Sequence, residues 1–274
     1  MMRVRLQNSI VWRHARLWAV FAGLVFLLIL GVWSPGLQKQ YENMLFAMMP
    51  TASRAAEYGT KHFDAQQYRS YDIQVAEHFY KEAAALDPQY PYVYHQLARI
   101  AFLRGEFDDA LALINKQISL HGDTAPKSYY IRALIEGYGG DYAAAAKDYE
   151  HYLTFAPVSW AAHNDYAWVL LKANRPQDAV KVTTDGLVYF PNNPWLLNTN
   201  ATALYETGDL AGARTAAEAA VRAAETLTEK EWLTAYPGND PHIAQAGIAA
   251  FKKATLDNMH TIELALASGA VQSR

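Results

Sequence analysis

Residues 139–146 read GGDYAAAA, and this short stretch carries the two features that recur along the whole chain. Its Gly140 is placed to end a helix, and Ala145 follows five residues later. A glycine in that place supplies the left-handed backbone that often follows a helix. An alanine leaves room for a second helix to approach closely. The stretch therefore predicts a tight turn between two helices that pack against each other.

The same turn and alanine recur at a fixed period. Helix-ending turns begin at Gly105, Gly140, Asn174 and Gly208. The recurring alanines are spaced by 34 or 35 residues and are Ala76, Ala110, Ala145, Ala179 and Ala213. A second column, expected in the first helix of each unit, is Ala98, Ala133, Ala167 and Ala201. Prolines that stop the second helix are Pro88, Pro157 and Pro191. Such a period predicts stacked helix pairs that share one core.

The first unit departs from this pattern. It offers only Ser70-Tyr71-Asp72-Ile73 as a turn, and Asp64 stands where the later units have a small residue. Gly122 and Glu225 replace the stop proline in the second and fifth units. The first unit and the ends of the array are therefore expected to differ in detail from the middle.

The period, the turn and the proline resemble the tetratricopeptide repeat, a pair of antiparallel helices that stacks into a solenoid. The resemblance covers roughly residues 55–225 and implies an all-α fold, a right-handed α-solenoid of about five helix pairs. We expect the solenoid over 51–225 and capping helices over 226–274. Asp240-Pro241 should open the main capping helix, because Asp is a good N-cap and Pro fits the first turn.

The N-terminus has the charge pattern of a membrane anchor. Residues 1–16 carry four arginines and no acidic side chain, and residues 17–33 carry no charge. A helix over 17–33 would extend about 25 Å, near the thickness of a hydrocarbon core. We expect a basic cytoplasmic tail and one transmembrane signal anchor. A buried core helix is one alternative. A cleaved signal peptide is another, although the run ends in Gly31-Val32-Trp33-Ser34-Pro35 without an Ala-x-Ala site.

Residues 34–50 begin with a Ser-Pro-Gly break and continue as an amphipathic segment. The side chains that share one helical face are Leu37, Tyr41, Met44, Leu45 and Met48. Two interpretations remain open. The segment lies on the membrane surface beside the anchor, or it caps the first repeat.

Charge and cysteine content exclude several classes of function. Lys and Arg number 24 against 27 Asp and Glu, and this net charge of −3 gives no reason to expect nucleic acid. The chain has no cysteine, so it has no disulfide, no thiolate catalysis and no zinc site built on sulfur. Its 51% apolar content argues for packed helices and against disorder.

Motifs for catalysis are missing from the sequence. There is no His-Glu-x-x-His helix, no Gly-x-Ser-x-Gly elbow and no phosphate loop, and the nine histidines show no ligand spacing. The glycines of residues 137–140 follow a helix and are expected to form a turn. Helical carboxylates expected on solvated faces are Asp108, Asp109, Asp148, Glu150 and Asp165. We expect no enzyme, no metal, no cofactor and no small-molecule substrate.

What remains is a surface for binding a protein or peptide. In the tetratricopeptide repeat family the first helices line a concave groove. The resemblance places these side chains in that groove: Tyr92, Arg99, Phe102, Lys127, Tyr130, Asn164, Trp168, Asn198 and Tyr205. Tyr, Trp and Arg are over-represented at binding hot spots. The alternative for each is a core position between repeats. The family's carboxylate-clamp positions are occupied by Lys61, Ala65, Gln96, Lys127 and Ile131. Two of these five match the clamp, which argues against a receptor for chaperone tails.

These observations favour a membrane-tethered scaffold. We expect it to hold a protein segment in its groove at the outer face of an inner membrane, with the repeats outside the cytoplasm and the membrane contact through residues 17–33. The alternative is a structural subunit of a secretion, pilus or envelope-assembly complex. A transient set of clients would favour the scaffold, and a fixed stoichiometric complex would favour the subunit.

Overall fold

The computed structural model describes residues 18, 21–23, 25–26 and 35–272, and the main elements of this part of the chain are helices. The longer helices are α2 (Pro35–Met48), α3 (Ala52–His62), α4 (Ile73–Leu86), α5 (Val93–Leu103), α6 (Phe107–His121), α7 (Lys127–Gly139), α8 (Tyr142–Phe155), α9 (Trp160–Lys172), α10 (Pro176–Tyr189), α11 (Pro194–Thr207), α12 (Leu210–Glu225), α13 (Glu229–Ala235) and α14 (Ala244–Gln272). Two short 3₁₀ turns are η1 (Gly122–Thr124) and η2 (Pro241–Ile243).

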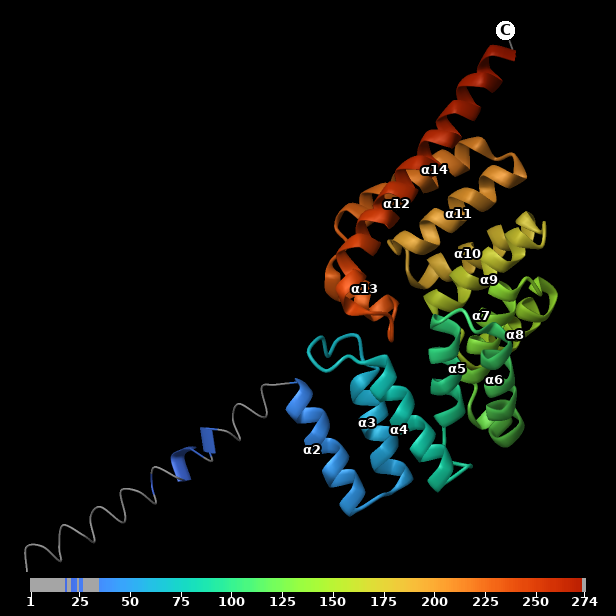
Figure 1. Cartoon of the computed structure of the whole chain (residues 1–274). Coiled ribbons are helices and arrows are strands. Elements are labelled where there is room, and N and C mark those ends of the chain that lie inside the picture. The colour runs from blue at the N-terminus through green and yellow to red at the C-terminus, as the bar shows by residue number, and fades with distance from the viewer. Residues whose placement is uncertain (1–17, 19–20, 24, 27–34, 273–274) are drawn as a thin grey trace, which may run out of the picture.

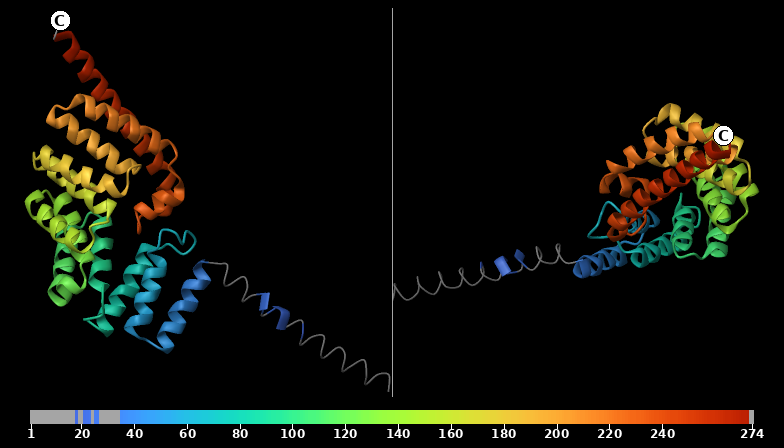
Figure 2. Two further views of the ribbon diagram at one scale, coloured as in Figure 1. Left: turned by 180° about the vertical axis from the view of Figure 1, so that it is seen from behind. Right: turned by 90° about the horizontal axis from the view of Figure 1, so that it is seen from above.

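The helices from α3 to α12 form successive antiparallel pairs. The closest contacts are within the pairs α3/α4, α5/α6, α7/α8, α9/α10 and α11/α12, which we call repeats 1 to 5. The second helix of each repeat also packs on the first helix of the next. The pairs follow one another from one end of the molecule to the other (Figures 1 and 2). This arrangement is the helical solenoid that the sequence period predicts.

The two alanine columns are the points where helices meet. All nine side chains are fully buried, namely Ala76, Ala98, Ala110, Ala133, Ala145, Ala167, Ala179, Ala201 and Ala213. A methyl group lets two backbones approach, and any larger side chain at these positions has to displace a packed neighbour. The period of about 34 residues therefore records a packing requirement that every repeat shares.

The turns inside repeats 2 to 5 follow the sequence prediction. The first helix of each is followed within two residues by one with positive φ, namely Gly105 (76°), Gly140 (91°), Asn174 (56°) and Gly208 (86°). Repeat 1 differs, because a loop over residues 63–72 joins its helices. The carboxylate of Asp72 caps α4 by accepting hydrogen bonds from the backbone N–H groups of Gln74 and Val75. The irregular first turn seen in the sequence is therefore a longer loop, with its own role described below.

Helix α2 packs on the first repeat. Phe46 is buried and its ring meets Phe79 edge-on at 5.7 Å. The buried carboxylate of Glu42 lies 2.6 Å from His62 Nε2 and 2.5 Å from Lys61 Nζ. Helix α2 therefore packs on the first repeat as the capping interpretation expects, but through Glu42 and Phe46 and not through the apolar face predicted from the sequence. The outer face stays exposed, with Leu37, Tyr41, Met44 and Met48 in contact with solvent.

Helix α14 closes the opposite end of the solenoid. It packs against α12 and touches α11, and Ile262 is fully buried in a cluster with Ala213 and Ala217 of α12. Its C-terminal turns project beyond the last repeat (Figure 1). Asp240 caps the short turn η2, where its carboxylate accepts a hydrogen bond from the backbone N–H of His242, and α14 begins directly after this turn at Ala244, not at Asp240-Pro241 as predicted.

The predicted location in a membrane needs correction. Most of the segment 17–33 lies outside the described residues. Among the residues that are described, no helix is both long and apolar enough to cross a bilayer. The 14 residues of α2 extend only about 21 Å and include Lys39 and Glu42. The 29 residues of α14 are long enough, but Lys252, Lys253 and Asp257 interrupt them. This finding contradicts the single-pass inner-membrane location.

Candidate binding groove

The first helices of the repeats line the inner side of the curved solenoid. Helix α5 contacts α7, α7 contacts α9, and α9 contacts α11, whereas the second helices pack mainly on first helices. The first helices are therefore closer to one another than the second helices are. Closer spacing on one side bends a stack towards that side, so the first helices form the concave face. We call this face the groove.

Arg99 occupies the groove at repeat 2. Its guanidinium lies 4.7 Å from the centre of the Phe63 ring and donates a 2.8 Å hydrogen bond to Gln96 Oε1. A second hydrogen bond runs from Arg99 Nη2 to the carbonyl oxygen of Pro237, in the C-terminal segment. Burial lowers the pKa of Arg99, and the surrounding tyrosines oppose that shift. Arg99 is therefore a partly desolvated cation inside the groove.

Two further predicted residues surround the same part of the groove. Tyr92 precedes α5 with a left-handed φ of 63°, and its ring meets His95 edge-on at 5.4 Å. Lys127 begins α7 and is exposed. Burial, followed by the charges of Arg99 and Lys127, lowers the pKa of His95 to about 3, and its Nδ1 lies 3.3 Å from Ser128 Oγ. His95 is therefore neutral near pH 7, and Arg99 and Lys127 supply the positive charge.

Three aromatic rings form a ladder across repeats 2 to 4. Phe102 of α5 meets Tyr138 of α7 edge-on at 5.2 Å, and Tyr138 stacks on Trp168 of α9 at 5.3 Å. Tyr138 is 58% exposed although it is a large ring. The ammonium group of Lys172 lies 5.9 Å from the centre of the Trp168 ring. We call Phe102, Tyr138 and Trp168 the aromatic ladder. It offers stacking surface that is already ordered.

Tyr130 and Asn164 meet at an inward-facing carboxylate. The Tyr130 hydroxyl donates a 2.6 Å hydrogen bond to Asp165 Oδ2, and Asn164 Nδ2 donates one of 3.0 Å to Asp165 Oδ1. The Asn164 carbonyl accepts from Thr199 Oγ1 at 2.8 Å. Burial raises the pKa of Asp165, while the two donors oppose the rise. The prediction of a solvated Asp165 is therefore wrong, because the carboxylate faces the neighbouring repeat and is held there.

Asp148 is a second carboxylate for which the prediction of a solvated face is wrong. It is buried, and Arg132 of α7 holds it through Nε–Oδ2 and Nη2–Oδ1 distances of 2.5 and 2.8 Å. Glu136 lies 3.7 Å from the same Arg132 Nε. Burial, followed by the charge of Asp148, raises the pKa of Glu136 to about 7. The cluster joins α7 to α8 within repeat 3 and serves packing in that repeat.

Asn198 and Tyr205 of α11 face the C-terminal cap. Asn258 of α14 donates through Nδ2 to Asn198 Oδ1 at 3.1 Å and to Thr202 Oγ1 at 3.2 Å. Tyr205 packs in the cluster that contains Ile262. Both residues lie on the expected face of α11, but there they contact α14 of the chain's own C-terminal cap. The structure therefore brings the other predicted residues together in repeats 2 to 4 and separates these two.

An aromatic cluster fixes the cap onto the groove. Trp195 of α11 is buried between Trp160 of α9, stacked at 4.9 Å, and Phe251 of α14, stacked at 5.4 Å. Trp232 and Tyr236 meet Trp195 at 6.3 and 6.1 Å. Helix α13 and the loop after it are thereby attached to the inner side of repeats 4 and 5.

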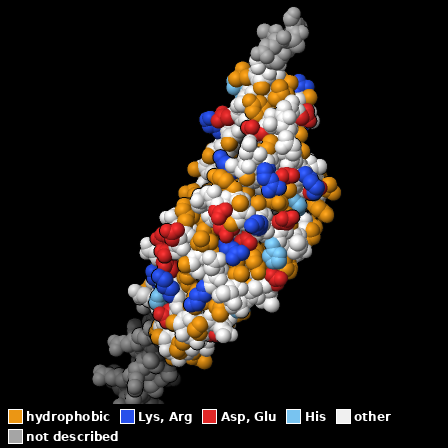
Figure 3. Space-filling model, turned by 90° about the vertical axis from the view of Figure 1, so that its right-hand side faces the viewer, with side chains coloured by type: hydrophobic (Ala, Val, Ile, Leu, Met, Phe, Trp, Pro, Cys, Tyr) orange, Lys and Arg blue, Asp and Glu red, His pale blue; other side chains and the backbone are white. Residues whose placement is uncertain are grey.

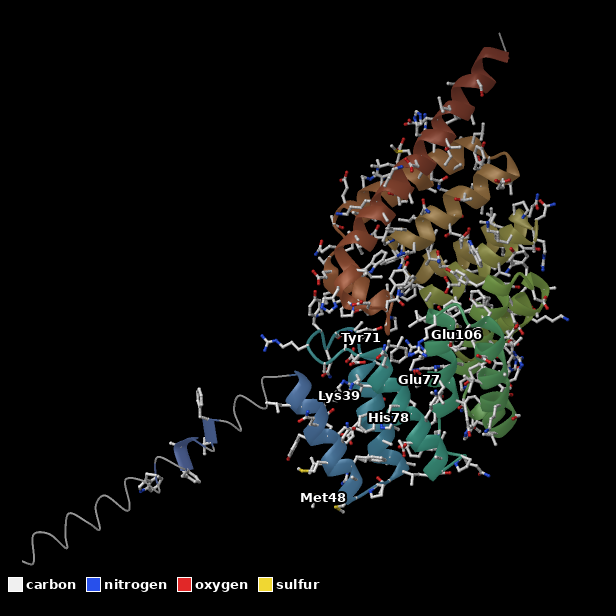
Figure 4. All side chains as sticks on the ribbon, viewed as in Figure 1. Lys39, Met48, Tyr71, Glu77, His78 and Glu106 are labelled. Carbon is white, nitrogen blue, oxygen red and sulfur yellow. The ribbon has the colours of Figure 1, made fainter. Side chains whose placement is uncertain are left out.

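Sequence reasoning missed the contact between this loop and repeat 1. The Tyr71 hydroxyl donates a 2.6 Å hydrogen bond to the carbonyl oxygen of Gly238, 167 residues away in the sequence. Tyr71 lies on the side of repeat 1 that faces the C-terminal segment (Figure 4). Burial, followed by the charge of Asp240, raises the pKa of Tyr71 to about 12. The irregular turn Ser70-Tyr71-Asp72-Ile73 is the one sequence signal that marked this place.

Other kinds of site find little support in the described part of the chain. No group of three or more His, Asp or Glu converges there in a way that could hold a metal ion. On the face shown in Figure 3, acidic and basic side chains are interspersed, so no single-sign patch covers it. The features left as a candidate binding site are the first helices and the aromatic ladder on them.

Stacked helix pairs with a lined concave face define a repeat scaffold that binds other proteins. Models of the tetratricopeptide repeat match residues 68–135, 132–184 and 194–219. The chain is a tetratricopeptide repeat protein, and protein partners are the partners that this class implies.

Solved structures of MamA share the fold. One crystal structure of MamA has a TM-score of 0.52 at 18% identity, covering 56% of this chain and 90% of MamA. A second, described as MamA MSR-1 C2, has a TM-score of 0.53 at 17% identity, covering 64% of this chain and 97% of that one. Identities this low establish the fold alone. Among curated proteins, none matches the sequence.

Proposed function

We propose that this chain is a scaffold that binds a segment of a partner protein in its groove, with the aromatic ladder as the main contact. The observation that carries the proposal is the exposure of Tyr138. The Tyr138 ring stacks on Trp168 and touches Phe102, and 58% of it is still exposed. Rigid aromatic side chains bind at low entropic cost, and they are the residues that dominate binding hot spots.

Two lysines of the first helices suit acidic side chains of a partner, one beside the aromatic ladder and one at the opposite end of α7 from Tyr138. Lys127 is exposed at the start of α7, and Lys172 lies over the Trp168 ring. Lys172 would steer an acidic segment towards the ladder, and Lys127 would hold the part of that segment that runs along α7. Either an extended segment or one face of a helix presents side chains at spacings that fit adjacent repeats.

The alternative role as a fixed subunit of a larger assembly has one observation in its favour. Helix α2 leaves Leu37, Tyr41, Met44 and Met48 exposed on one face. Exposed apolar strips of this kind are typical of permanent interfaces. A subunit would use α2 and the outer helices, whereas a scaffold would use the ladder.

Site-specific photocrosslinking of the full chain in its own host cells separates the two roles. A photoreactive phenylalanine analogue replaces Tyr138 in one variant and Tyr189 in a control. Tyr189 is 52% exposed at the end of α10, a second helix, so it matches Tyr138 in exposure but not in position. The proposal predicts a discrete adduct at 138 that is missing at 189. Adducts only at 189, or only at a third site replacing Met44, would favour the subunit role.

A further inference from the structure

The loop over residues 236–240, which we call the latch, crosses from the C-terminal cap to the first two repeats. Tyr71 donates to the carbonyl of Gly238 at 2.6 Å, and Arg99 donates to the carbonyl of Pro237. Next to the latch, the rings of Tyr68 and His242 lie 4.3 Å apart. The chain thus places a short piece of its own backbone against the groove, and the groove side chains bind carbonyl groups of that piece.

Gly238 fits this place as no other residue would. Its φ is +97°, which side chains rarely adopt, and it is buried. A Cβ there would lie 2.7 Å from Arg99 Nη2 and 2.9 Å from Phe63 Cζ. The close approach of backbone to groove is therefore a built contact and depends on the missing side chain.

Within this contact, Arg99 is a charged donor that has only neutral acceptors. Its nearest acceptors are neutral, namely Gln96 Oε1 and the Pro237 carbonyl, and its other contact is the Phe63 ring. Among the described residues no carboxylate lies within ion-pair distance of Arg99. A guanidinium binds a carboxylate more strongly than a carbonyl, because both groups are charged and the pairing can be bidentate. The latch therefore offers Arg99 a carbonyl oxygen, which is a weaker acceptor than a carboxylate would be.

We propose that the latch is an intramolecular ligand of repeats 1 and 2, and that an extended acidic segment displaces it by placing a carboxylate on Arg99. This inference rests on the proposed function, since the displaced latch exposes the groove to the partner. Tyr236, at the start of the latch, packs on Trp195 of repeat 5 and on Trp232 of α13, so the latch also reaches the inner side of repeat 5. Opening it lengthens the accessible groove in both directions from the ladder.

The test uses the full chain and a fluorescent synthetic peptide of residues 232–243. Gly238→Ala should open the latch, because its methyl group strains the φ of +97° and presses against Arg99 and Phe63, while no groove residue is replaced. Gly208→Ala is the matched control, because Gly208 has a similar φ of +86° and a Cβ added to it would have no neighbouring atom within 4 Å. We expect the peptide to bind Gly238→Ala at least about tenfold more tightly than wild type or Gly208→Ala, since an open groove no longer has to release its own ligand.

A second arm tests the role of Arg99. Adding Arg99→Gln to Gly238→Ala should weaken peptide binding about tenfold, the range for loss of a hydrogen bond from a charged donor. A peptide carrying Pro237→Glu should bind the opened chain more tightly than the unchanged peptide. Equal binding of the peptide by wild type and Gly238→Ala would overturn the latch. Equal binding of the unchanged and the Pro237→Glu peptides would contradict the proposal that the partner segment is acidic.

Tyr71→Phe keeps the inference testable if Gly238→Ala does not fold. It removes one hydroxyl that holds the latch and leaves the ring in place, so amide hydrogen exchange of residues 236–240 should rise about tenfold or more over wild type. Unchanged exchange would overturn the latch. These assays use the chain's own segment, so they give a result even if photocrosslinking at position 138 finds no partner. Conversely, an adduct at 138 with a closed latch would leave the proposed function intact.

Discussion

Tyr130→Phe removes a single oxygen and tests whether this groove residue serves packing or binding. The lost hydroxyl donates at 2.6 Å to Asp165, whose other hydrogen-bond donor among the described residues is Asn164 at 3.0 Å. A hydrogen bond to a charged group contributes about 1.5–3 kcal/mol, and its loss leaves a buried carboxylate half satisfied. We therefore expect Tyr130→Phe to lower the free energy of unfolding by about 2 kcal/mol at pH 7.

The effect should depend on pH with a definite sign. Burial raises the pKa of Asp165, so its folded pKa lies above the unfolded value and folding favours the protonated acid. Its contribution to stability is complete below the unfolded pKa and is lost as the pH rises through the folded pKa. Because the Tyr130 hydroxyl partly offsets this loss, Tyr130→Phe should cost most above the folded pKa. Once Asp165 is protonated, the cost should fall to about 1 kcal/mol.

Urea denaturation of the full chain, followed by circular dichroism at several pH values between 4 and 8, measures both effects. Tyr166→Phe is the control, because Tyr166 is also partly buried and follows Asp165 in the chain but does not donate to its carboxylate. Similar losses for the two variants, or a loss for Tyr130→Phe that ignores pH, would refute this account of Tyr130. In that case the residue would return to the set of binding contacts.

Two further predictions concern the packing and the charge of the repeats. Ala179→Leu should lower the free energy of unfolding by about 1–3 kcal/mol, because it overpacks a fully buried contact. Ala143→Leu, at an exposed position, should lower it by less than about 0.5 kcal/mol, and thermal melting of both variants measures the difference. Equal shifts would contradict the repeat register. The pKa of Glu136 is raised from 4.5 to about 7, so wild-type stability should fall by up to about 3 kcal/mol between those pH values, and Glu136→Gln should flatten that fall in the same melts. An unchanged slope would show that another group titrates there.

The periodic part of the fold could be predicted because one packing event repeats. Ala145 and its equivalents are fully buried since each lies where two backbones touch, and this requirement leaves a mark every 34 or 35 residues. The left-handed turn at Gly140 is likewise a local event with a local signal. The repeats and the short turns inside repeats 2 to 5 follow from such signals.

The sequence predicts which helices line the groove, but it does not predict which groove side chains already have partners within the chain. The ladder residues Phe102 and Trp168 each contact the Tyr138 ring that lies between them. The sequence predicts a solvated Asp165, because nothing near it in the sequence shows that Tyr130 of the previous repeat reaches it. The pairing of Tyr71 with Gly238 spans 167 residues and has no periodic trace. Contacts that occur once in a solenoid leave no repeated signal to read.

The membrane prediction failed for a related reason. It rested on the uncharged run 17–33, a signal of composition alone, and most of that run lies outside the described residues. In the described part of the chain, α2 packs on the first repeat through Phe46, which meets Phe79. Exposed apolar side chains on its outer face, such as Met44, then belong to the surface of a repeat protein.

The measurement that tests the central claim most directly is the dissociation constant between the full chain and the partner crosslinked at position 138. Binding through the ladder predicts that Trp168→Ala weakens this complex by about 1–3 kcal/mol, or roughly 5- to 150-fold, whereas Tyr189→Ala leaves it unchanged. Melting curves of both variants show whether they remain folded. Wild-type affinity in folded Trp168→Ala, or equal losses in the two variants, would contradict binding in the groove.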